Sequence, residues 1–272
     1  MYTNRLYDKQ FQINKVTFKV RLGRVLFYIK HLVMNDFGGY EEPTSRAFWG
    51  SEDLEENPTP DPTFSLEWLT DTPSSIKKLV VIAGDLVTAI AEKHIVHNAK
   101  RVCTINSTTE FNVAALFRLT DDLYVCTAKS SVDITSTGEL TDTISDIVSQ
   151  AEIIIAFTDA NISKIHGAVH DVVSPTLWRS LSTGKGREDR LSKVPSLEHP
   201  NFIAGLAAGV VGYAEMMSLP ATMYIMYAAD DVYDTETVEP MIKLFSDVTD
   251  YAVPKIDHNT KTLNSDKLKL YI

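Results

Sequence analysis

Continuous apolar runs alternate along the chain with stretches in which apolar residues recur every three or four positions. The runs at 79–83 and 153–157 consist of apolar residues alone, as do most positions of "LYVCTA" (123–128) and "PATMYIMYAAD" (220–230). Such runs are typical of strands that are buried on both faces of a sheet. The pattern therefore predicts strands at these four places.

Amphipathic stretches follow or precede these runs. Segments 85–98, 139–151 and 237–248 each place their apolar residues on one helical face. Gly84 can turn the chain out of the first strand, and Asp85 can cap the helix that follows. Pro240 falls in the first turn of the last predicted helix, where proline is tolerated.

The segment "NFIAGLAAGVVGYAEMMSLP" (201–220) is unusually rich in small residues. Gly205 and Gly209 form a GxxxG motif, which favours helix dimers in membranes. Glu215 interrupts the stretch and Pro220 ends it, and about 18 residues is a marginal membrane span. We therefore expect a buried core helix whose backbone lies close to the sheet.

The alternation of strands and helices predicts one α/β domain with a largely parallel central sheet flanked by helices. We assign this domain to residues 75–250. Residues 34–74 are acidic and rich in proline and are expected to be a disordered lead-in. Residues 251–272 are polar until their last positions and are expected to form a flexible C-terminal tail.

Residues 1–33 differ in charge from the rest of the chain. They carry seven basic side chains and one acidic one, which gives +6 against a formal net charge of -10 for the whole sequence. The segment lacks serine and a long apolar run, so it is a poor targeting peptide. Two interpretations stay open: a basic amphipathic surface element, or an upstream extension with Met34 starting the functional chain.

Charge and cysteine content exclude several classes of protein. A net charge of -10 argues against a nucleic-acid binder or an anionic-membrane binder, because both need a basic surface. Cys103 and Cys126 lie in apolar stretches without zinc-ligand spacing, and they are expected to be two buried thiols in a reducing compartment. We expect no metal and no cofactor, and a cytoplasmic protein with the nucleus as a second location.

Catalytic motifs are absent from the sequence. No G-x-G-x-x-G follows Gly84, the loop "STGKGRE" (182–188) does not fit a P-loop, and there is no G-x-S-x-G elbow. These absences favour a protein that is not an enzyme. The alternative is a small-molecule enzyme of nucleoside phosphorylase or hydrolase type with a dispersed active site.

Pairs of titratable residues give no clearer indication of chemistry. The histidine pairs 94/97 and 166/170 have helical spacing but lack the glutamate of a zinc protease motif, so surface or core histidines are the better interpretation. Asp121–Asp122 and Asp230–Asp231 are adjacent in predicted extended chain. Neighbouring side chains of a strand point to opposite faces, so neither pair is expected to share a substrate.

The chain ends on "KLKLYI", an apolar end on a free carboxylate. A hydrophobic residue before a penultimate tyrosine arises at about 2% of random chain ends, so the motif alone is weak. It could be a last strand docked on the domain, a ligand for a PDZ domain, or a peptide captured by another partner. In capture, Leu270 fills an apolar slot, Tyr271 finds a hydrogen-bond acceptor, and the carboxylate of Ile272 pairs with a donor.

Longer stretches resemble the proteasome assembly chaperones. The similarity runs through "IKKLVVIAGDLVTAIAE" and "EIIIAFTD" and is greatest over "SLEHPNFIAGLAAGVVGYAEMMSLPATMYIMYAADDVYDTETVEPMIKLF". Leu197-Glu198-x-Pro200-Asn201 and Leu219-Pro220-Ala221 carry much of it. The resemblance implies an α/β sandwich similar to nucleoside phosphorylases but without their catalysis.

The same resemblance implies partners and a site. It implies a heterodimer with a second, related chaperone that caps the forming α ring of the proteasome core particle and blocks off-pathway α-ring dimers. It also implies that Leu270, Tyr271 and Ile272, as a hydrophobic–tyrosine–any-residue motif, insert into a pocket between adjacent α subunits. No nucleic acid and no membrane is expected among the partners.

Overall fold

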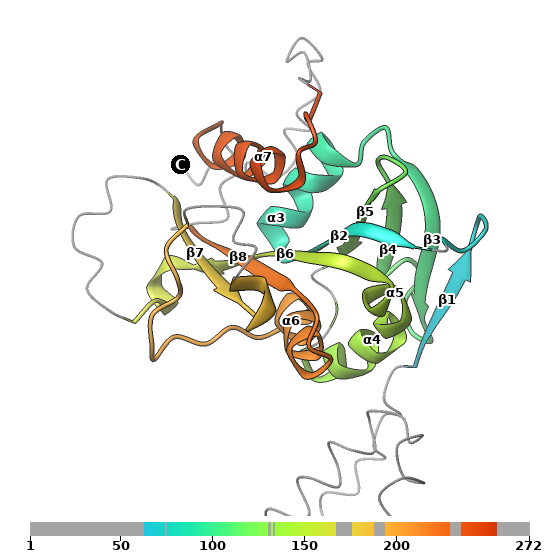
Figure 1. The fold of residues 1–272 in the computed structure, drawn as a ribbon, viewed down its shortest axis with the longest axis horizontal. Helices are drawn as coiled ribbons and strands as arrows, with labels where there is room; N and C mark the ends of the chain where they lie inside the picture. Colours follow the sequence, from blue (N-terminus) through green and yellow to red (C-terminus); the bar gives the residue numbers. More distant parts are fainter. Residues whose placement is uncertain are drawn as a thin grey trace, which may run out of the picture.

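A single eight-stranded sheet forms the centre of the molecule, with strands in the order β1-β3-β4-β5-β2-β6-β8-β7 (Figure 1). The computed structural model describes residues 63–73, 75–129, 132, 134–166, 176–187, 194–228 and 235–254. The strands are β1 (Phe64–Trp68), β2 (Ile76–Ala83), β3 (Lys100–Ser107), β4 (Ala114–Arg118), β5 (Leu123–Ala128), β6 (Ala151–Asn161), β7 (Thr176–Ser182) and β8 (Ala221–Ala228).

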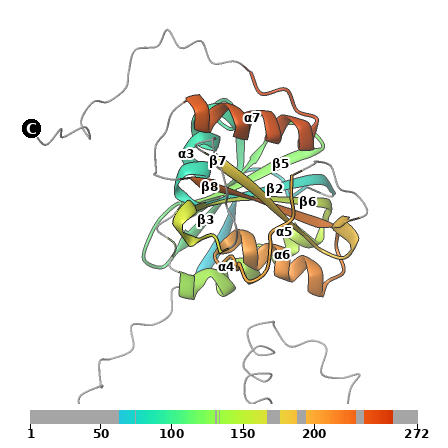
Figure 2. The ribbon, with the colours of Figure 1, turned by 90° about the vertical axis from the view of Figure 1, so that its left-hand side faces the viewer.

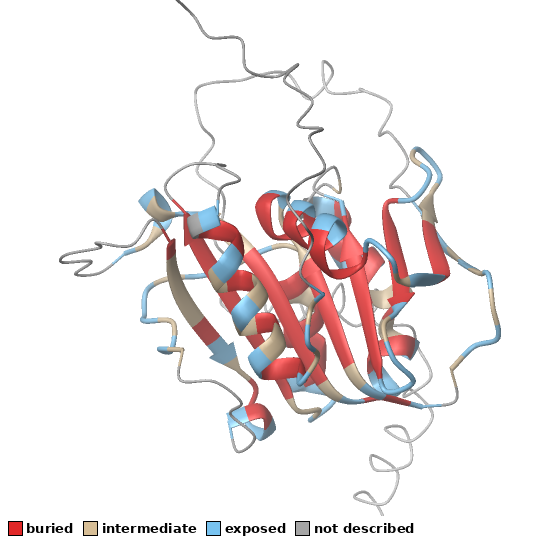
Figure 3. Cartoon of the chain, turned by 90° about the horizontal axis from the view of Figure 1, so that it is seen from above, coloured by how far each residue is buried: buried red, intermediate tan, exposed pale blue. Residues whose placement is uncertain are grey.

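Helices cover both faces of this sheet. The α-helices are α3 (Asp85–Ile90), α4 (Thr137–Thr143), α5 (Ser145–Ser149), α6 (Leu206–Met216) and α7 (Thr235–Thr249). Helices α3 and α7 lie on one face, and α4, α5 and α6 lie on the other (Figures 1 and 2). Two apolar clusters result, one on each side, and the central strands are buried along most of their length (Figure 3).

The sheet is mixed, so the prediction of a largely parallel sheet is wrong. The four strands β5, β2, β6 and β8 run parallel to one another. On one side β4, β3 and β1 continue the sheet in antiparallel pairs, and on the other side β7 pairs antiparallel with β8. The four parallel strands are the four that the apolar runs predict, and the antiparallel strands are those that the sequence pattern missed.

The missed strands lack a long apolar run for a physical reason. Strand β1 alternates between half-buried and exposed residues, and β3 begins with exposed Lys100 and Arg101. Antiparallel strands near an edge need to bury only one face or one part of their length. Their sequences therefore alternate between apolar and polar residues, or are apolar along only part of the strand. Strand β4 has only five residues.

The helical predictions hold with altered boundaries. The stretch 85–98 forms α3 followed by a single π-helical turn, Ala91–Ile95, and the stretch 139–151 divides at Ile144 into α4 and α5. Helix α7 begins at Thr235, so Pro240 lies inside the helix rather than in its first turn. A proline there removes one helical N–H donor, which the buried apolar face of α7 must offset.

The boundaries of the folded part also differ from the prediction. Strand β1 lies within the segment 34–74 that was expected to be disordered, so the fold begins at least ten residues before residue 75. Beyond residue 250, Tyr251 and Val253 pack against the apolar cluster under α7. The Tyr251 ring meets that of Phe245 edge-on, with centroids 6.4 Å apart.

Helix α6 is a core helix, as its small residues predict. Ala207 and Ala214 are buried in the cluster beneath the sheet. Gly209, however, faces α4 rather than the sheet, and a Cβ atom built there would lie 2.5 Å from Oγ1 of Thr141. A Cβ atom at Gly212 would have no described atom within 4 Å of it. Among the described helices none is long and apolar enough to cross a membrane.

The two cysteines are buried and unbonded to each other, as expected. Cys103 on β3 and Cys126 on β5 both pair in register with Leu116 of β4, so the three side chains share one face of the sheet. Burial raises the pKa of the Cys103 thiol to about 11 and that of the Cys126 thiol to about 12. Both thiols are therefore protonated at neutral pH.

The two glycines of α6 make a matched pair for a stability test. Gly209→Ala should lower the free energy of unfolding by about 1–3 kcal/mol, because the new methyl group overlaps Oγ1 of Thr141. That hydroxyl donates to the carbonyl of Thr137 at 2.7 Å and cannot turn away without losing the bond. Gly212→Ala should raise the free energy of unfolding by about 0.5–1 kcal/mol through helix propensity alone. Urea denaturation of dilute protein measures both, and equal effects would contradict the α4–α6 contact.

The cysteines should be inert in the native protein. The thiolate is the reactive form of cysteine, and both burial and the raised pKa values suppress it. We expect Ellman's reagent at pH 8 to label neither thiol in the native state and both in urea. Ser65→Cys, which places a thiol at an exposed position of β1, is the control that should react at once. Rapid native labelling of the wild-type chain would show that the sheet opens locally at β3 to β5.

Candidate functional site

The terminal residues Leu270, Tyr271 and Ile272 lie outside the described residues, and so does the rest of the tail after Pro254. The point from which the tail departs is well defined. Nζ of Lys78, on β2, donates to the carbonyl of Thr249 at 3.0 Å and to Oδ2 of Asp250 at 2.6 Å. This hydrogen bond and the charge of Lys78 lower the pKa of the Asp250 carboxyl. The end of α7 is thus tied to a central strand of the sheet.

Besides the terminal residues, the structure offers a second candidate site, a cleft of about 680 Å³ at the carboxyl ends of β2, β5 and β6. Ligands of open α/β sheets commonly bind at this place. Its lining includes Lys129, Thr158, Asp159, Lys164 and the exposed ring of Phe202. The predicted alternative, a small-molecule enzyme, would need these groups to converge on a substrate.

Several of the cleft's polar groups already serve the fold. Oδ1 of Asp159 accepts the backbone N–H of Val87 at 3.1 Å, which holds the first turn of α3 against β6. Nζ of Lys129 donates to Oε1 of Glu110 at 3.0 Å. Gly84 must be glycine here: its φ is 143°, and a Cβ atom would lie 2.2 Å from Oδ1 of Asp159. Asp159 and Lys129 therefore hold structural contacts, and Gly84 forms a packed strand-to-helix turn at the cleft.

The other sequence candidates do not come together. His94 and His97 line a separate cavity of about 300 Å³, and the described residues contain no cluster of three potential metal ligands. Asp121 pairs with Arg118, whereas Asp122 lies 3.6 Å from Nζ of Lys77. The two neighbouring carboxylates thus have different partners, although they lie in the bend between β4 and β5 and not in an extended strand as predicted. His170 and the pair Asp230–Asp231 lie outside the described residues.

The glycine-containing loop after β7 is a tight structural turn rather than a phosphate-binding loop. Oγ1 of Thr183 accepts the backbone N–H groups of Gly186 and Ala221 at 3.1 and 3.0 Å. A Cβ atom at Gly186 would lie 2.2 Å from the carbonyl oxygen of Ala221. The glycine therefore allows the loop to approach the first residue of β8.

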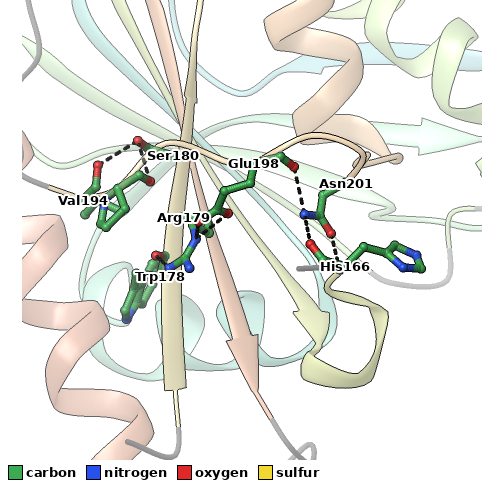
Figure 4. Close-up of polar contacts among 8 residues, drawn as sticks. His166, Trp178, Arg179, Ser180, Val194, Glu198 and Asn201 are labelled. Carbon is green, nitrogen blue, oxygen red and sulfur yellow. Dashed lines mark hydrogen bonds and ion pairs between the residues drawn. The ribbon is translucent and has the colours of Figure 1, made fainter. Parts of the chain in front are cut away.

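The segment 194–201, which carries much of the family resemblance, fastens the edge of the sheet (Figure 4). The backbone N–H of Ser180 on β7 donates to the carbonyl of Pro195, and that of Leu197 donates to the carbonyl of Ser180, both at 2.8 Å. Nε of Arg179 donates to both carboxylate oxygens of Glu198, at 3.0 and 2.8 Å. These bonds occupy backbone groups on the outer side of β7 that would otherwise be open to another strand.

Asn201 closes the other end of this segment. Its side-chain amide donates to the carbonyls of His166 and Glu198 at 2.7 and 2.8 Å, and Oδ1 accepts the N–H of His166 at 2.6 Å (Figure 4). The segment is thereby bonded both to β7 and to the chain beyond β6. The motif Glu198-x-Pro200-Asn201 thus has a structural role that the sequence alone did not assign.

The ion pair of this segment makes stability depend on pH. The hydrogen bond from Arg179 lowers the pKa of Glu198, so the charged form of Glu198 favours the folded state. For a carboxyl whose pKa is lowered by folding, the stabilisation is full above the unfolded pKa and is lost as pH falls through the folded pKa. The side chain of Glu198 is 51% exposed, so solvent screening keeps the effect small.

Glu198→Gln should lower the free energy of unfolding by about 0.5–1 kcal/mol at pH 7. The difference from wild type should shrink as the pH falls below the ordinary range of a glutamate carboxyl, because Glu198 of the wild-type chain then becomes protonated. Urea denaturation at neutral pH and in acid measures the difference. Glu139→Gln, at an exposed position of α4, is the control that should change little. A difference that persists unchanged at low pH would mean that the ion pair is not its source.

No family model matches the chain, and a search of curated proteins finds no relative by sequence. Solved structures do match its fold. PbaB of Pyrococcus furiosus, an archaeal proteasome activator, aligns with a TM-score of 0.54 and 12% identity over 72% of this chain and 91% of its own. PbaA of Pyrococcus furiosus, an archaeal homologue of proteasome-assembly chaperone, aligns with a TM-score of 0.54 and 10% identity over 71% and 88%.

A Thermoplasma acidophilum protein of unknown function aligns equally well, with a TM-score of 0.54, 12% identity and coverage of 67% and 80%. At such low identity the alignments show a common fold. The resemblance found in the sequence is therefore supported at the level of the fold. The chain has the fold of the archaeal proteasome activator PbaB and of the proteasome-assembly chaperone homologue PbaA.

Proposed function

We propose that this protein is a chaperone that promotes assembly of the proteasome core particle. It acts with a second, related chaperone as a heterodimer that binds the α ring. It inserts Leu270, Tyr271 and Ile272 between adjacent α subunits and prevents off-pathway α-ring dimers. The observation that carries the proposal is a fold shared with PbaA and PbaB in a chain that ends in a hydrophobic–tyrosine–any-residue motif.

The energetics of the tail require a second contact through the folded domain. Burying Leu270 contributes about 1.5–3 kcal/mol, and a charge-assisted contact of the terminal carboxylate about 1.5–3 kcal/mol more. Fixing three or four backbone residues costs about 1–2 kcal/mol each. These contributions nearly cancel, so the tail selects a pocket while the domain supplies affinity.

The geometry where the tail leaves the domain suits this division of roles between tail and domain. Lys78 fixes the end of α7 to the sheet, and residues 255–272 make a segment of eighteen residues. Fully extended, such a segment spans at most about 60 Å. The domain can thus contact one part of an α ring while the terminal residues enter a pocket elsewhere on it.

The cleft at the carboxyl ends of the parallel strands supports the enzyme alternative less than the fold and the terminal motif support a chaperone. Asp159 and Lys129, two of its charged residues, are engaged in bonds that hold α3 and the β3–β4 connection in place. We therefore propose a function that works through protein contacts, in the cytoplasm and also in the nucleus. A thermal shift with nucleosides or phosphate would revive the enzyme alternative.

Deleting residues 270–272, or adding two residues after Ile272, should weaken α-subunit binding, since either change removes the leucine or carboxylate contact. Affinity purification with quantitative mass spectrometry of the co-purifying subunits measures it. The matched control is Ser265→Ala, a change in the same tail away from the motif. The thermal unfolding temperature should be the same for all variants.

Each outcome of this experiment has a distinct meaning. If both tail variants retain α subunits as well as wild type does, the insertion mechanism is wrong. If the wild-type chain co-purifies with no proteasome subunit, the proposed function itself is wrong. Co-purification of a second α/β chaperone with every variant would support the heterodimer and place its interface on the domain.

A further inference from the structure

An apolar surface is exposed where α6 meets β7. Leu181 on β7 is 41% exposed, Met216 at the end of α6 is 63% exposed, and Met217 after it is 51% exposed. Between β7 and α6 runs a groove of about 410 Å³ whose lining includes Leu181, Ile203 and Val211. Exposed large apolar side chains on two adjoining elements mark a contact site more often than chance. We call this surface the α6 face.

The middle of the α6 face is flat because its helix carries small residues there. Ala208 and Gly212 are one turn apart, and both line the groove. Glycine inside a helix costs about 0.5–1 kcal/mol relative to alanine. Gly209 has a packing reason within the chain, its contact with Thr141, whereas Gly212 meets no described atom within 4 Å. The absence of a side chain at Gly212 leaves room for an approaching backbone.

Charges of opposite sign flank the α6 face on its two sides. On the side of α4 and α5, three acidic residues, Glu139, Asp142 and Asp146, are exposed or half-exposed, and residues 137–150 contain no lysine or arginine. On the side of β7, Lys185 and Arg187 are exposed in the turn after the strand. Glu215 also lies on that side, where its carboxylate accepts the N–H of Gly184 at 2.8 Å. Among the described residues, the second side therefore has a net charge of +1 against -3 for the first.

This arrangement is self-complementary. Helix α6 lies between α4 with α5 and the β7 edge of the same face of the sheet (Figures 1 and 2). A two-fold axis that lies in the plane of the interface and nearly parallel to α6 would bring the acidic side of one molecule against the basic side of the other, twice. An isologous interface needs such a surface, with an apolar centre and a charged rim that matches itself after rotation.

We propose that the α6 face binds a second copy of this chain, with the two α6 helices crossing at Gly212 around a two-fold axis. The small residues let the helices approach closely, and Leu181, Met216 and Met217 are removed from water. This pairing goes beyond the proposed function and does not depend on binding to proteasome subunits. It concerns the chain when no other chaperone occupies that face.

The steric part of the proposal is tested with Gly212→Gln in the full-length chain. Glutamine is a good helix former and has open space within its own molecule, so the monomer should fold normally, which circular dichroism checks. Sedimentation equilibrium should give a dimer for the wild-type chain and a dissociation constant raised by about tenfold or more for the variant. Phe111→Gln, which removes an apolar side chain 80% exposed elsewhere, is the control that should leave the dimer intact.

The electrostatic part is tested with two charge-reversed variants. One is Glu139→Lys with Asp142→Lys and Asp146→Lys, and the other is Lys185→Glu with Arg187→Glu. Each alone should be monomeric, because like charges then face each other across the axis. An equal mixture of the two should dimerise, because both rims are then again opposite in charge, and 1 M salt should weaken that mixed dimer.

The proposal is overturned if the wild-type chain is monomeric at all accessible concentrations, or if Gly212→Gln dimerises as wild type does. It is also overturned if the two charge-reversed variants stay monomeric in the mixture. Binding of α subunits by a chain that fails these tests would leave the proposed function intact.

Discussion

The structure depends on four parallel strands that must be covered on both faces. β5, β2, β6 and β8 have almost no exposed side chains, so each face of this part of the sheet requires a helical layer. The chain supplies α3 and α7 on one face and α4, α5 and α6 on the other. Each functional element described above is positioned by this sandwich. The tail departs from α7, the cleft opens at the ends of the parallel strands, and the α6 face is the outer side of a covering helix.

The need to bury both faces of these four strands also determines how much of the fold the sequence predicts. The strands buried on both faces have continuous apolar sequences, and all four are predicted from them. Strands β1, β3 and β7 were missed because partial burial leaves their sequences alternating or mixed, and β4 was missed because it is short although buried. The prediction of a largely parallel sheet is wrong for this reason. The strands that the sequence pattern predicts are parallel, and the missed strands are antiparallel and make the sheet mixed.

The sites show a second limit of sequence reasoning. Gly209 and Gly212 look alike in the sequence, yet one is fixed by Thr141 of α4 and the other faces open space. Glu198 and Asn201 contribute to a family resemblance, but only the structure shows that they hold the edge of β7. Roles of this kind depend on which distant segment lies opposite a residue, and a single sequence does not contain that information. The terminal motif is the converse case, since the role proposed for it depends only on the local chemistry of three residues.

In the proposed function, a fixed starting point for the tail would let a weak terminal motif select one pocket. Lys78 joins the end of α7 to β2, so the origin of the tail is fixed relative to every surface of the domain. Eighteen residues follow Pro254, and a random coil of that length would have a root-mean-square span of about 25 Å and give an effective concentration in the millimolar range. In the proposed function, a motif too weak to hold a pocket alone would add occupancy only where a docked domain brings a pocket within reach. It would also leave when the domain leaves. Under that proposal, specificity and release would both follow from the weak binding of the terminal motif.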